Sequence, residues 1–143
     1  MHFPIHYKQI SRPGDGHIDA ALALYHMCFP SVERQPDAVI RERVSSGLAS
    51  LTVGLLNDEV ACFAITWSFQ HPAVNFLDYL AVDPRYRASG YGSGLLKFLE
   101  QQYKINNEYL VLEVEHPGFG NNKEERIKRI SFYQKAGAVI CSD

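Results

Sequence analysis

A glycine-rich segment in the second half of the chain has residue types that could bind a phosphate group. It comprises Arg87, Ala88, Ser89, Gly90, Tyr91, Gly92 and Ser93. The segment lies between a predicted strand at 76–82 and a predicted helix at 92–103. Glycines let backbone amides approach a ligand closely, and a helix N-terminus directs free N–H groups and a partial positive charge at it. The segment therefore predicts an anion site that would fit a pyrophosphate.

Two other phosphate-binding motifs fit this segment less well. Glu113 lies about where the ribose-binding acid of a dinucleotide fold would be, but Gly90, Gly92 and Gly94 do not have G-x-G-x-x-G spacing. Several predicted elements also precede the glycines. A Walker loop would need Gly-Lys-Ser or Gly-Lys-Thr, which the sequence lacks.

The hydrophobic pattern changes period along the chain, which predicts one mixed α/β domain over residues 1–143. Strands are predicted at 5–10, 51–56, 60–67, 76–82, 109–114 and 138–141. Helices are predicted at 18–29, from Pro36 to just before Gly47, at 92–103 and at 124–136. The strands at 76–82 and 109–114 flank a helix, so the crossover predicts a parallel pair, whereas 51–56 and 60–67 predict an antiparallel hairpin.

Composition narrows the classes of partner. The chain has 14 basic and 16 acidic residues and a formal charge of -2, so it lacks the positive field that binds nucleic acid. Three cysteines without C-x-x-C spacing and scattered histidines predict a reducing compartment and no metal. No run approaches the roughly 20 apolar residues of a membrane span, so we expect a cytoplasmic protein without a membrane partner.

Three segments in the second half together resemble the GNAT superfamily of acetyltransferases. Arg87, Gly90 and Gly92 fill its coenzyme A loop pattern, Q/R-x-x-G-x-G/A, after a strand that ends in Ala-Val-Asp-Pro. Residues 110–114 resemble the family's fifth strand, and residues 130–138 resemble its F-Y-E-K-x-G-F segment. The resemblance covers about 76–138 and implies a mixed, mostly antiparallel α/β (α+β) sheet with a parallel pair and flanking helices.

The resemblance implies that the chain binds acetyl-coenzyme A as acyl donor. The loop at 87–93 would hold the pyrophosphate. In the family the fourth and fifth strands splay apart and the pantetheine arm lies between them, so the backbone of Leu80, Ala81 and Val82 would hold that arm. A backbone N–H there would polarise the thioester carbonyl.

Tyr133 matches the family's tyrosine near the thioester sulfur, where a phenol can donate a proton to the departing thiolate. The alternative is a core aromatic, because Ile127, Ile130 and Tyr133 form one apolar stripe of the predicted helix. Arg126 takes the place of a cofactor-contacting asparagine that many members have. It could bind the 3′-phosphate of the nucleotide, or it could simply be solvated.

An acceptor amine must lose a proton before it attacks, so the site needs a base or a chain of waters. Glu113 matches an acidic position that some members use as base, and a buried acid in such a strand would have a raised pKa. Asp78 is the second candidate. Alternation puts one set of side chains on a common face, namely Phe76, Asp78, Leu80 and Val82. Phe76 stands where other members carry a catalytic glutamate, and either acid could instead be structural.

The loop between the first two predicted helices often covers the acceptor in this superfamily, so Phe29, Glu33 and Arg34 are expected to contact substrate. The implied reaction is transfer of an acetyl group to a primary amine of a small molecule or peptide, by direct attack within a ternary complex. A catalytically degenerate coenzyme A-binding or interaction module is the alternative.

The chain ends near the strand predicted at 138–141, whereas the family usually continues with a further strand. We therefore expect a sheet shortened at its C-terminal end. An unpaired strand edge invites pairing with another chain, which predicts a homodimer.

Overall fold

The computed structural model describes residues 4–10, 12, 14–70, 73–114 and 122–139. Its elements, in chain order, are β1 (Ile5–Ile10), α1 (His17–Cys28), the 3₁₀ helix η1 (Ser31–Glu33), α2 (Asp37–Ser45), β2 (Ala49–Leu56), β3 (Glu59–Gln70), β4 (Ala73–Val82), the 3₁₀ helix η2 (Pro84–Tyr86), α3 (Tyr91–Ile105), β5 (Tyr109–Leu112) and α4 (Lys123–Lys135).

The chain divides into two compact units, residues 1–111 and residues 112–143. The first contains the sheet and the helices α1 to α3, and the second contains α4. Each unit is described by itself below. The single domain over 1–143 stays a prediction.

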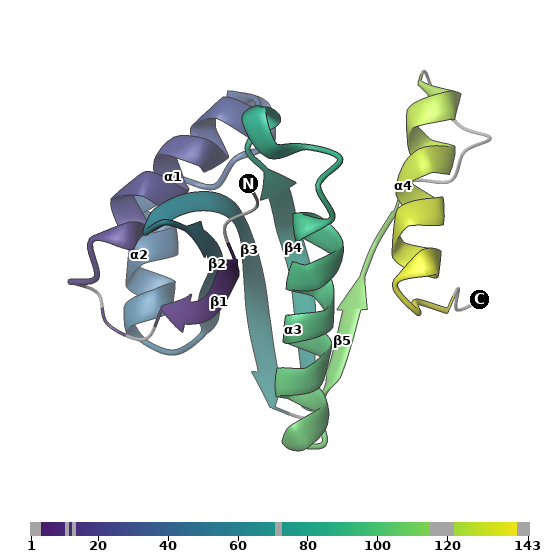
Figure 1. Ribbon diagram of the computed structural model, residues 1–143. Coiled ribbons are helices and arrows are strands. Elements are labelled where there is room, and N and C mark those ends of the chain that lie inside the picture. The colour runs from purple at the N-terminus through teal and green to yellow at the C-terminus, as the bar shows by residue number, and fades with distance from the viewer. Residues whose placement is uncertain (1–3, 11, 13, 71–72, 115–121, 140–143) are drawn as a thin grey trace. The chain divides into compact units, whose positions relative to one another are not determined.

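The strands form one five-stranded sheet in the order β1-β2-β3-β4-β5 (Figure 1). Strands β1 to β4 pair antiparallel, and β4 and β5 run parallel. The β2–β3 hairpin turns at Asn57 and Asp58, whose φ angles of 49° and 66° match the two-residue turn that suits the twist of a hairpin. These features confirm the predicted fold class.

Helices cover both faces of the first unit's sheet. Tyr25 of α1 and Ile40 of α2 are completely buried in one core cluster with Phe63 of β3. On the other face α3 packs its buried residues Leu95 and Leu99. Burying each such side chain stabilises the fold by roughly 1.5–3 kcal/mol. The sheet is therefore held between two apolar layers, and its strand ends are positioned rigidly.

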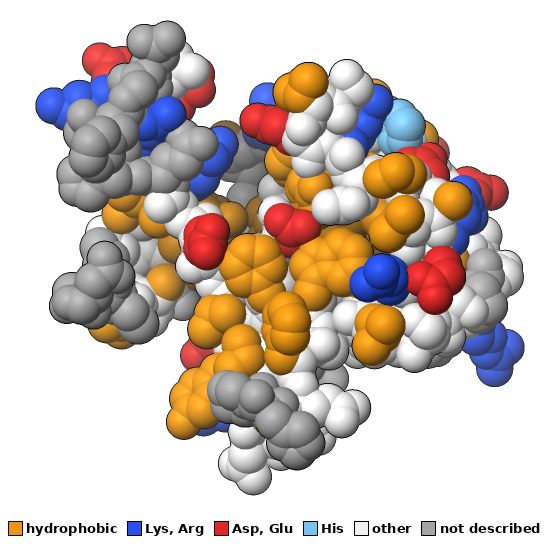
Figure 2. Space-filling model, turned by 180° about the vertical axis from the view of Figure 1, so that it is seen from behind, with side chains coloured by type: hydrophobic (Ala, Val, Ile, Leu, Met, Phe, Trp, Pro, Cys, Tyr) orange, Lys and Arg blue, Asp and Glu red, His pale blue; other side chains and the backbone are white. Residues whose placement is uncertain are grey.

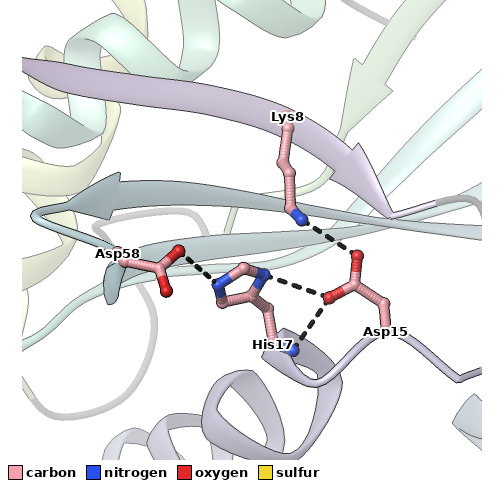
Figure 3. Close-up of polar contacts among 4 residues, drawn as sticks. All are labelled: Lys8, Asp15, His17 and Asp58. Carbon is pink, nitrogen blue, oxygen red and sulfur yellow. Dashed lines mark hydrogen bonds and ion pairs between the residues drawn. The ribbon is translucent and has the colours of Figure 1, made fainter.

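A polar cluster ties the start of α1 to the β2–β3 turn (Figure 3). The Asp15 carboxylate accepts hydrogen bonds from Lys8 Nζ at 2.9 Å and from the His17 backbone N–H at 2.9 Å. The two ring nitrogens of His17 lie 3.0 Å from Asp15 and 3.0 Å from Asp58. These bonds, led by the one from the His17 backbone, lower the pKa of Asp15. The cluster fixes α1 relative to the hairpin.

Several element ends differ from the predictions by one or two residues, and three differences are larger or move a predicted site residue. Strand β3 continues to Gln70 and β4 begins at Ala73, because the pairing of the two strands extends as far as these two residues. Strand β5 ends at Leu112, so Glu113 follows the strand instead of lying inside it. Of the strand predicted at 138–141, Ala138 and Val139 are not in a strand, and residues 140 and 141 lie outside the described residues.

Candidate active site

The loop after β4 begins with a tightly bonded turn. The Asp83 carboxylate caps η2 by accepting the backbone N–H of Arg85 at 2.9 Å, and the Arg85 guanidinium Nη2 donates to it at 3.0 Å. Asp83 is buried, and its own N–H donates to the Ala61 carbonyl of β3 at 2.8 Å. The Arg85 guanidinium lowers the pKa of Asp83. The turn is therefore anchored to β3 by the Asp83 backbone and closed by the Asp83 side chain.

Two left-handed residues bring the chain from this turn into α3. Ala88 has φ 64°, and Gly90, the residue before the helix, has φ 82°. This conformation costs a non-glycine residue about 1–2 kcal/mol, which explains the glycine at 90. The helix then begins at Tyr91, so the first N–H groups of α3, including those of Gly92 and Ser93, have no acceptor within the helix. The predicted anion site depends on N–H groups of this kind at a helix N-terminus.

Tyr7 of β1 holds the start of α3 in place, although no local pattern around it indicates this role. Its hydroxyl donates to the Tyr91 carbonyl at 2.7 Å, and its ring lies 5.8 Å from that of Phe98. Burial raises the pKa of Tyr7 to about 12. A Cβ at Gly94 would collide with this hydroxyl, so the third glycine of the segment makes room for Tyr7. The only sequence signal was that glycine inside a helix.

The Arg87 side chain is exposed at the start of the loop. Its Nε donates to the Val82 carbonyl at 3.4 Å, so the guanidinium stays close to the end of β4. Burial raises the pKa of the Cys28 thiol at the end of α1, and the charge of Arg87 acts in the opposite direction. Arg87 therefore brings a positive charge to the segment between β4 and α3, where a bound phosphate would need one.

The last residues of β4 are placed beside this loop. Leu80, Ala81 and Val82 are half-buried and pair with Ala64, Phe63 and Cys62 of β3. Successive backbone groups along a strand point to alternate edges, so part of the N–H and C=O groups at 80–82 faces away from β3. On that edge β4 neighbours β5, and the resemblance expects the pantetheine arm between these two strands.

A β-bulge in the β3–β4 pair changes the predicted side-chain alternation. Tyr79 pairs with Ile65 and Leu77 pairs with Thr66, which leaves Asp78 without a partner on β3. Paired residues point to the same side of a sheet. Ile65 belongs to the core beneath α1 and α2, whereas Thr66 lies within 2.7 Å of the Tyr103 hydroxyl of α3. The two sides of the bulge therefore face opposite ways.

The prediction that Phe76, Asp78, Leu80 and Val82 share a face is consequently wrong. Phe76 pairs with Trp67, which packs against the core beneath α1 and α2. Leu80 pairs with Ala64, which lies between the core residues of β3 and so faces α3. The extra residue inserted by the bulge is the physical reason.

Asp78 is exposed, and its Oδ2 accepts the indole N–H of Trp67 at 2.8 Å. Burial raises the pKa of the Tyr25 hydroxyl, the neighbouring Tyr79 raises it further, and the charge of Asp78 adds to this. Tyr25 in turn accepts the backbone N–H of Gln35 at 2.7 Å. Asp78 therefore lies on the side of the sheet that carries the loop between α1 and α2.

That loop contains the three predicted substrate residues, and the structure gives each a definite place. The Phe29 ring lies 5.0 Å from the Tyr79 ring, and the Glu33 carbonyl accepts the Tyr79 hydroxyl at 2.5 Å. The Glu33 side chain is exposed. Arg34 Nη1 donates to the carbonyls of His26 and Phe29 at 3.1 and 3.0 Å, which secures the end of α1. Phe29 and Glu33 thus lie over Tyr79, next in sequence to Asp78.

The remaining predicted site residues belong to the second unit. Tyr133 is half-buried, with its ring 5.1 Å from that of Phe132. Burial raises the pKa of the Tyr133 phenol, and Arg129 acts in the opposite direction. Arg126 is half-buried, and its backbone N–H donates to the Asn122 carbonyl. Glu113 is exposed and follows β5.

A separate open cleft of about 720 Å³ lies between α1 and the β2–β3 turn. Its polar lining includes His17, Asp58, Asp83 and Arg85. These groups already pair with one another, His17 with Asp58 and Asp83 with Arg85, each at 3.0 Å. The cleft therefore offers less unused bonding capacity than the loop before α3.

Two further findings concern the described residues only. Within 4–10, 12, 14–70, 73–114 and 122–139, no group of three or more histidine, cysteine, aspartate or glutamate side chains is arranged to hold a metal ion. Across the same residues, every helix is too short or too polar to span a bilayer.

Comparisons with known proteins bear directly on this geometry. A sequence profile described as an acetyltransferase (GNAT) domain matches residues 49–137. No curated protein matches the sequence at a significant level.

Solved structures share the fold. A protein from Bacteroides thetaiotaomicron assigned to the GNAT acetyltransferases is 26% identical, with a TM-score of 0.75 over 92% of this chain and 70% of that one. An aminoglycoside acetyltransferase from an uncultured soil sample, in complex with sisomicin, is 10% identical, with a TM-score of 0.78 over 97% and 91%. A ribosomal-protein-alanine N-acetyltransferase from Brucella melitensis is 18% identical, with a TM-score of 0.66 over 98% and 96%.

The profile covers more than half of the chain and includes β4, the loop at 87–93 and α3, which are the elements of the predicted anion site. The sheet order and the parallel β4–β5 pair match those of the solved relatives. The chain belongs to the GNAT family of acetyltransferases.

Proposed function

We propose that this protein is an N-acetyltransferase that moves the acetyl group of acetyl-coenzyme A to a primary amine of a small molecule or peptide. The observation that carries the proposal is the loop from Arg87 to Ser93, where the left-handed Gly90 directs the chain into α3 and leaves its first amides free to bind an anion. Family membership supports acetyl-coenzyme A as the ligand that brings this anion, a pyrophosphate.

The proposed roles follow the course of the donor over the protein. The amides of 87–93 and the Arg87 guanidinium would hold the pyrophosphate. Backbone groups at Leu80, Ala81 and Val82 would hold the pantetheine arm, and one N–H there would polarise the thioester carbonyl. Arg126 of the second unit is proposed to contact the nucleotide.

In the chemical step, the amine nitrogen attacks the thioester carbonyl, a carbon–nitrogen bond forms and the carbon–sulfur bond breaks. The departing thiolate takes a proton, for which we propose Tyr133, because burial raises the pKa of its phenol and keeps it protonated at neutral pH. Asp78 or Glu113, both exposed, or a water would take the proton that the amine loses.

The acceptor would lie beneath the loop between α1 and α2, near Phe29, Glu33 and Arg34. Relatives with this fold include an aminoglycoside acetyltransferase and a ribosomal-protein-alanine acetyltransferase, so the fold is compatible with both small-molecule and peptide amines. A homodimer in the cytoplasm is part of the same proposal, and sedimentation at micromolar concentration tests the dimer.

Release of coenzyme A thiol from acetyl-coenzyme A, corrected for hydrolysis, tests the function with a panel of polyamines, aminoglycosides, amino acids and peptides. Amine-dependent release with a mass-identified acetylated product supports the enzyme. Tight coenzyme A binding with no release for any acceptor would instead favour a binding module. Absence of both binding and release would refute the proposal.

A further inference from the structure

The β-bulge brings together the aromatic side chain of Trp67 and the carboxylate of Asp78. The proposed reaction gives these two side chains no shared role. Building on the proposed acetyltransferase function, we infer that Trp67 and Asp78 select the acceptor, and that they select cationic amines with an apolar or aromatic group and no neighbouring carboxylate. Arylalkylamines are the simplest members of this class.

The bulge sets the direction of Asp78. Because Asp78 is the extra residue opposite the Ile65–Thr66 step, no residue of β3 is paired with it, and its side chain reaches the indole of Trp67. Only Oδ2 takes part in that bond, and among the described residues Oδ1 has no hydrogen-bond or ion-pair partner. One carboxylate oxygen is therefore left to bind a donor from outside the protein.

Trp67 is held firmly enough to act as a recognition surface. Its indole N–H is fixed by Asp78, and the half-buried ring packs against the core beneath α1 and α2. Phe76 stands directly opposite it on β4 and is also half-buried. A cation bound at Asp78 beside an indole gains from the carboxylate charge and from the ring face, and the aromatic pair offers an apolar surface next to it.

The position of Asp78 along β4 suits a residue that binds the acceptor amine. Leu80, the first residue proposed to hold the pantetheine arm, lies two residues beyond Asp78, which corresponds to about 7 Å along a strand. An amine near Asp78 would thus be close to the thioester. Figure 2, the reverse of the view in Figure 1, shows hydrophobic side chains gathered with acidic ones among them.

The surrounding charges disfavour a carboxylate on the acceptor. Glu33 on the adjacent loop is exposed and negative. Arg34, the cation of that loop, directs Nη1 to the carbonyls of His26 and Phe29. An α-amino acid would bring its carboxylate towards Asp78, whereas the matching amine without the carboxylate would not meet this repulsion.

Phenethylamine and phenylalanine form a matched pair, because they differ only in the carboxylate. We expect the wild-type kcat/KM for phenethylamine to exceed that for phenylalanine by at least about a hundredfold. Asp78→Asn should raise KM for phenethylamine about tenfold or more and shrink this preference, while KM for acetyl-coenzyme A stays unchanged. Trp67→Phe keeps an aromatic ring but loses the N–H donor, and should raise KM for phenethylamine several-fold.

Glu100→Gln is the control, since Glu100 is an exposed acid of α3 on the opposite face and the change removes the same charge. Equal kcat/KM for the two compounds in the wild type, or an equal loss for both in Asp78→Asn and Glu100→Gln, would overturn the inference.

Binding can be measured even if no acetyl transfer occurs. Trp67 is the single tryptophan of the chain, so intrinsic tryptophan fluorescence reports on this site alone. Phenethylamine should change the fluorescence saturably, phenylalanine much less, and Asp78→Asn should weaken the response to phenethylamine. Saturable binding without turnover would count against the proposed function and for the inference. Turnover of other amines with no fluorescence response to phenethylamine would refute the inference alone.

Discussion

Replacing Gly90 by alanine tests the left-handed conformation at the start of α3. A Cβ at Gly90 meets no atom within 4 Å, so the substitution adds backbone strain and no collision. The φ of 82° then costs about 1–2 kcal/mol of folding free energy, which lowers Tm by roughly 3–7 °C in a chain of 143 residues.

Gly47→Ala is a matched control for that variant. Gly47 has φ 81°, and a Cβ there also meets nothing within 4 Å, but it follows α2, away from the loop. Both variants should lose similar stability. Only Gly90→Ala should weaken coenzyme A binding, because a chain that relaxes from this conformation moves the amides of α3. Loss of one charge-assisted hydrogen bond, about 1.5–3 kcal/mol, corresponds to a roughly 10- to 150-fold rise in Kd.

Thermal unfolding and calorimetric titration with coenzyme A measure the two effects separately. If Gly90→Ala loses stability as Gly47→Ala does and still binds coenzyme A with wild-type affinity, the loop does not hold the pyrophosphate. If neither variant loses stability, the strain argument is wrong.

Three other substitutions test neighbouring parts of the account. Tyr133→Phe should lower kcat about a hundredfold with coenzyme A affinity unchanged, and an unchanged kcat would make Tyr133 a packing residue. Because burial raises the pKa of Tyr133, proton donation to the thiolate should fail only as pH rises above the ordinary tyrosine pKa near 10. Gly94→Ala should lower the free energy of unfolding, measured by chemical denaturation, by about 1–3 kcal/mol because the new Cβ displaces the Tyr7 hydroxyl, and adding Tyr7→Phe should recover part of this loss. Equal losses with and without that hydroxyl would show that the hydroxyl is not the obstacle. The Arg85 guanidinium lowers the pKa of Asp83, so this carboxylate stabilises the fold above the ordinary aspartate pKa near 4 and loses that contribution as pH falls through the lowered pKa. Asp83→Asn should therefore flatten the acid side of a curve of Tm against pH, and an unchanged acid side would contradict this prediction.

Much of the fold could be predicted because its signals are local. The β2–β3 turn at Asn57 and Asp58, the glycine before α3 and the crossover between β4 and β5 each depend on residues close together in the chain. The loop at 87–93 was predictable for the same reason, since its glycines lie between a strand and a helix.

The features that sequence reasoning missed depend on long-range packing. The bulge at Asp78 arises from the register between β3 and β4, and a strict alternation cannot include an extra residue whose position only the partner strand fixes. Strict alternation therefore placed Phe76 and Leu80 on one face, although they point to opposite faces of the sheet. Tyr7 is 84 residues from the carbonyl that its hydroxyl binds, so nothing near it in the chain indicates this contact.

Backbone amide chemical shifts during titration with coenzyme A provide the sharpest test of the proposed cofactor loop, because they report where on the chain the cofactor binds. We predict that the largest shifts fall on the amides of residues 88–93, at the start of α3, and that Arg87→Ala reduces them. Saturable binding whose largest shifts fall elsewhere, for example around His17 and Asp58 in the cleft beside α1, or the absence of any shift at 88–93, would contradict it.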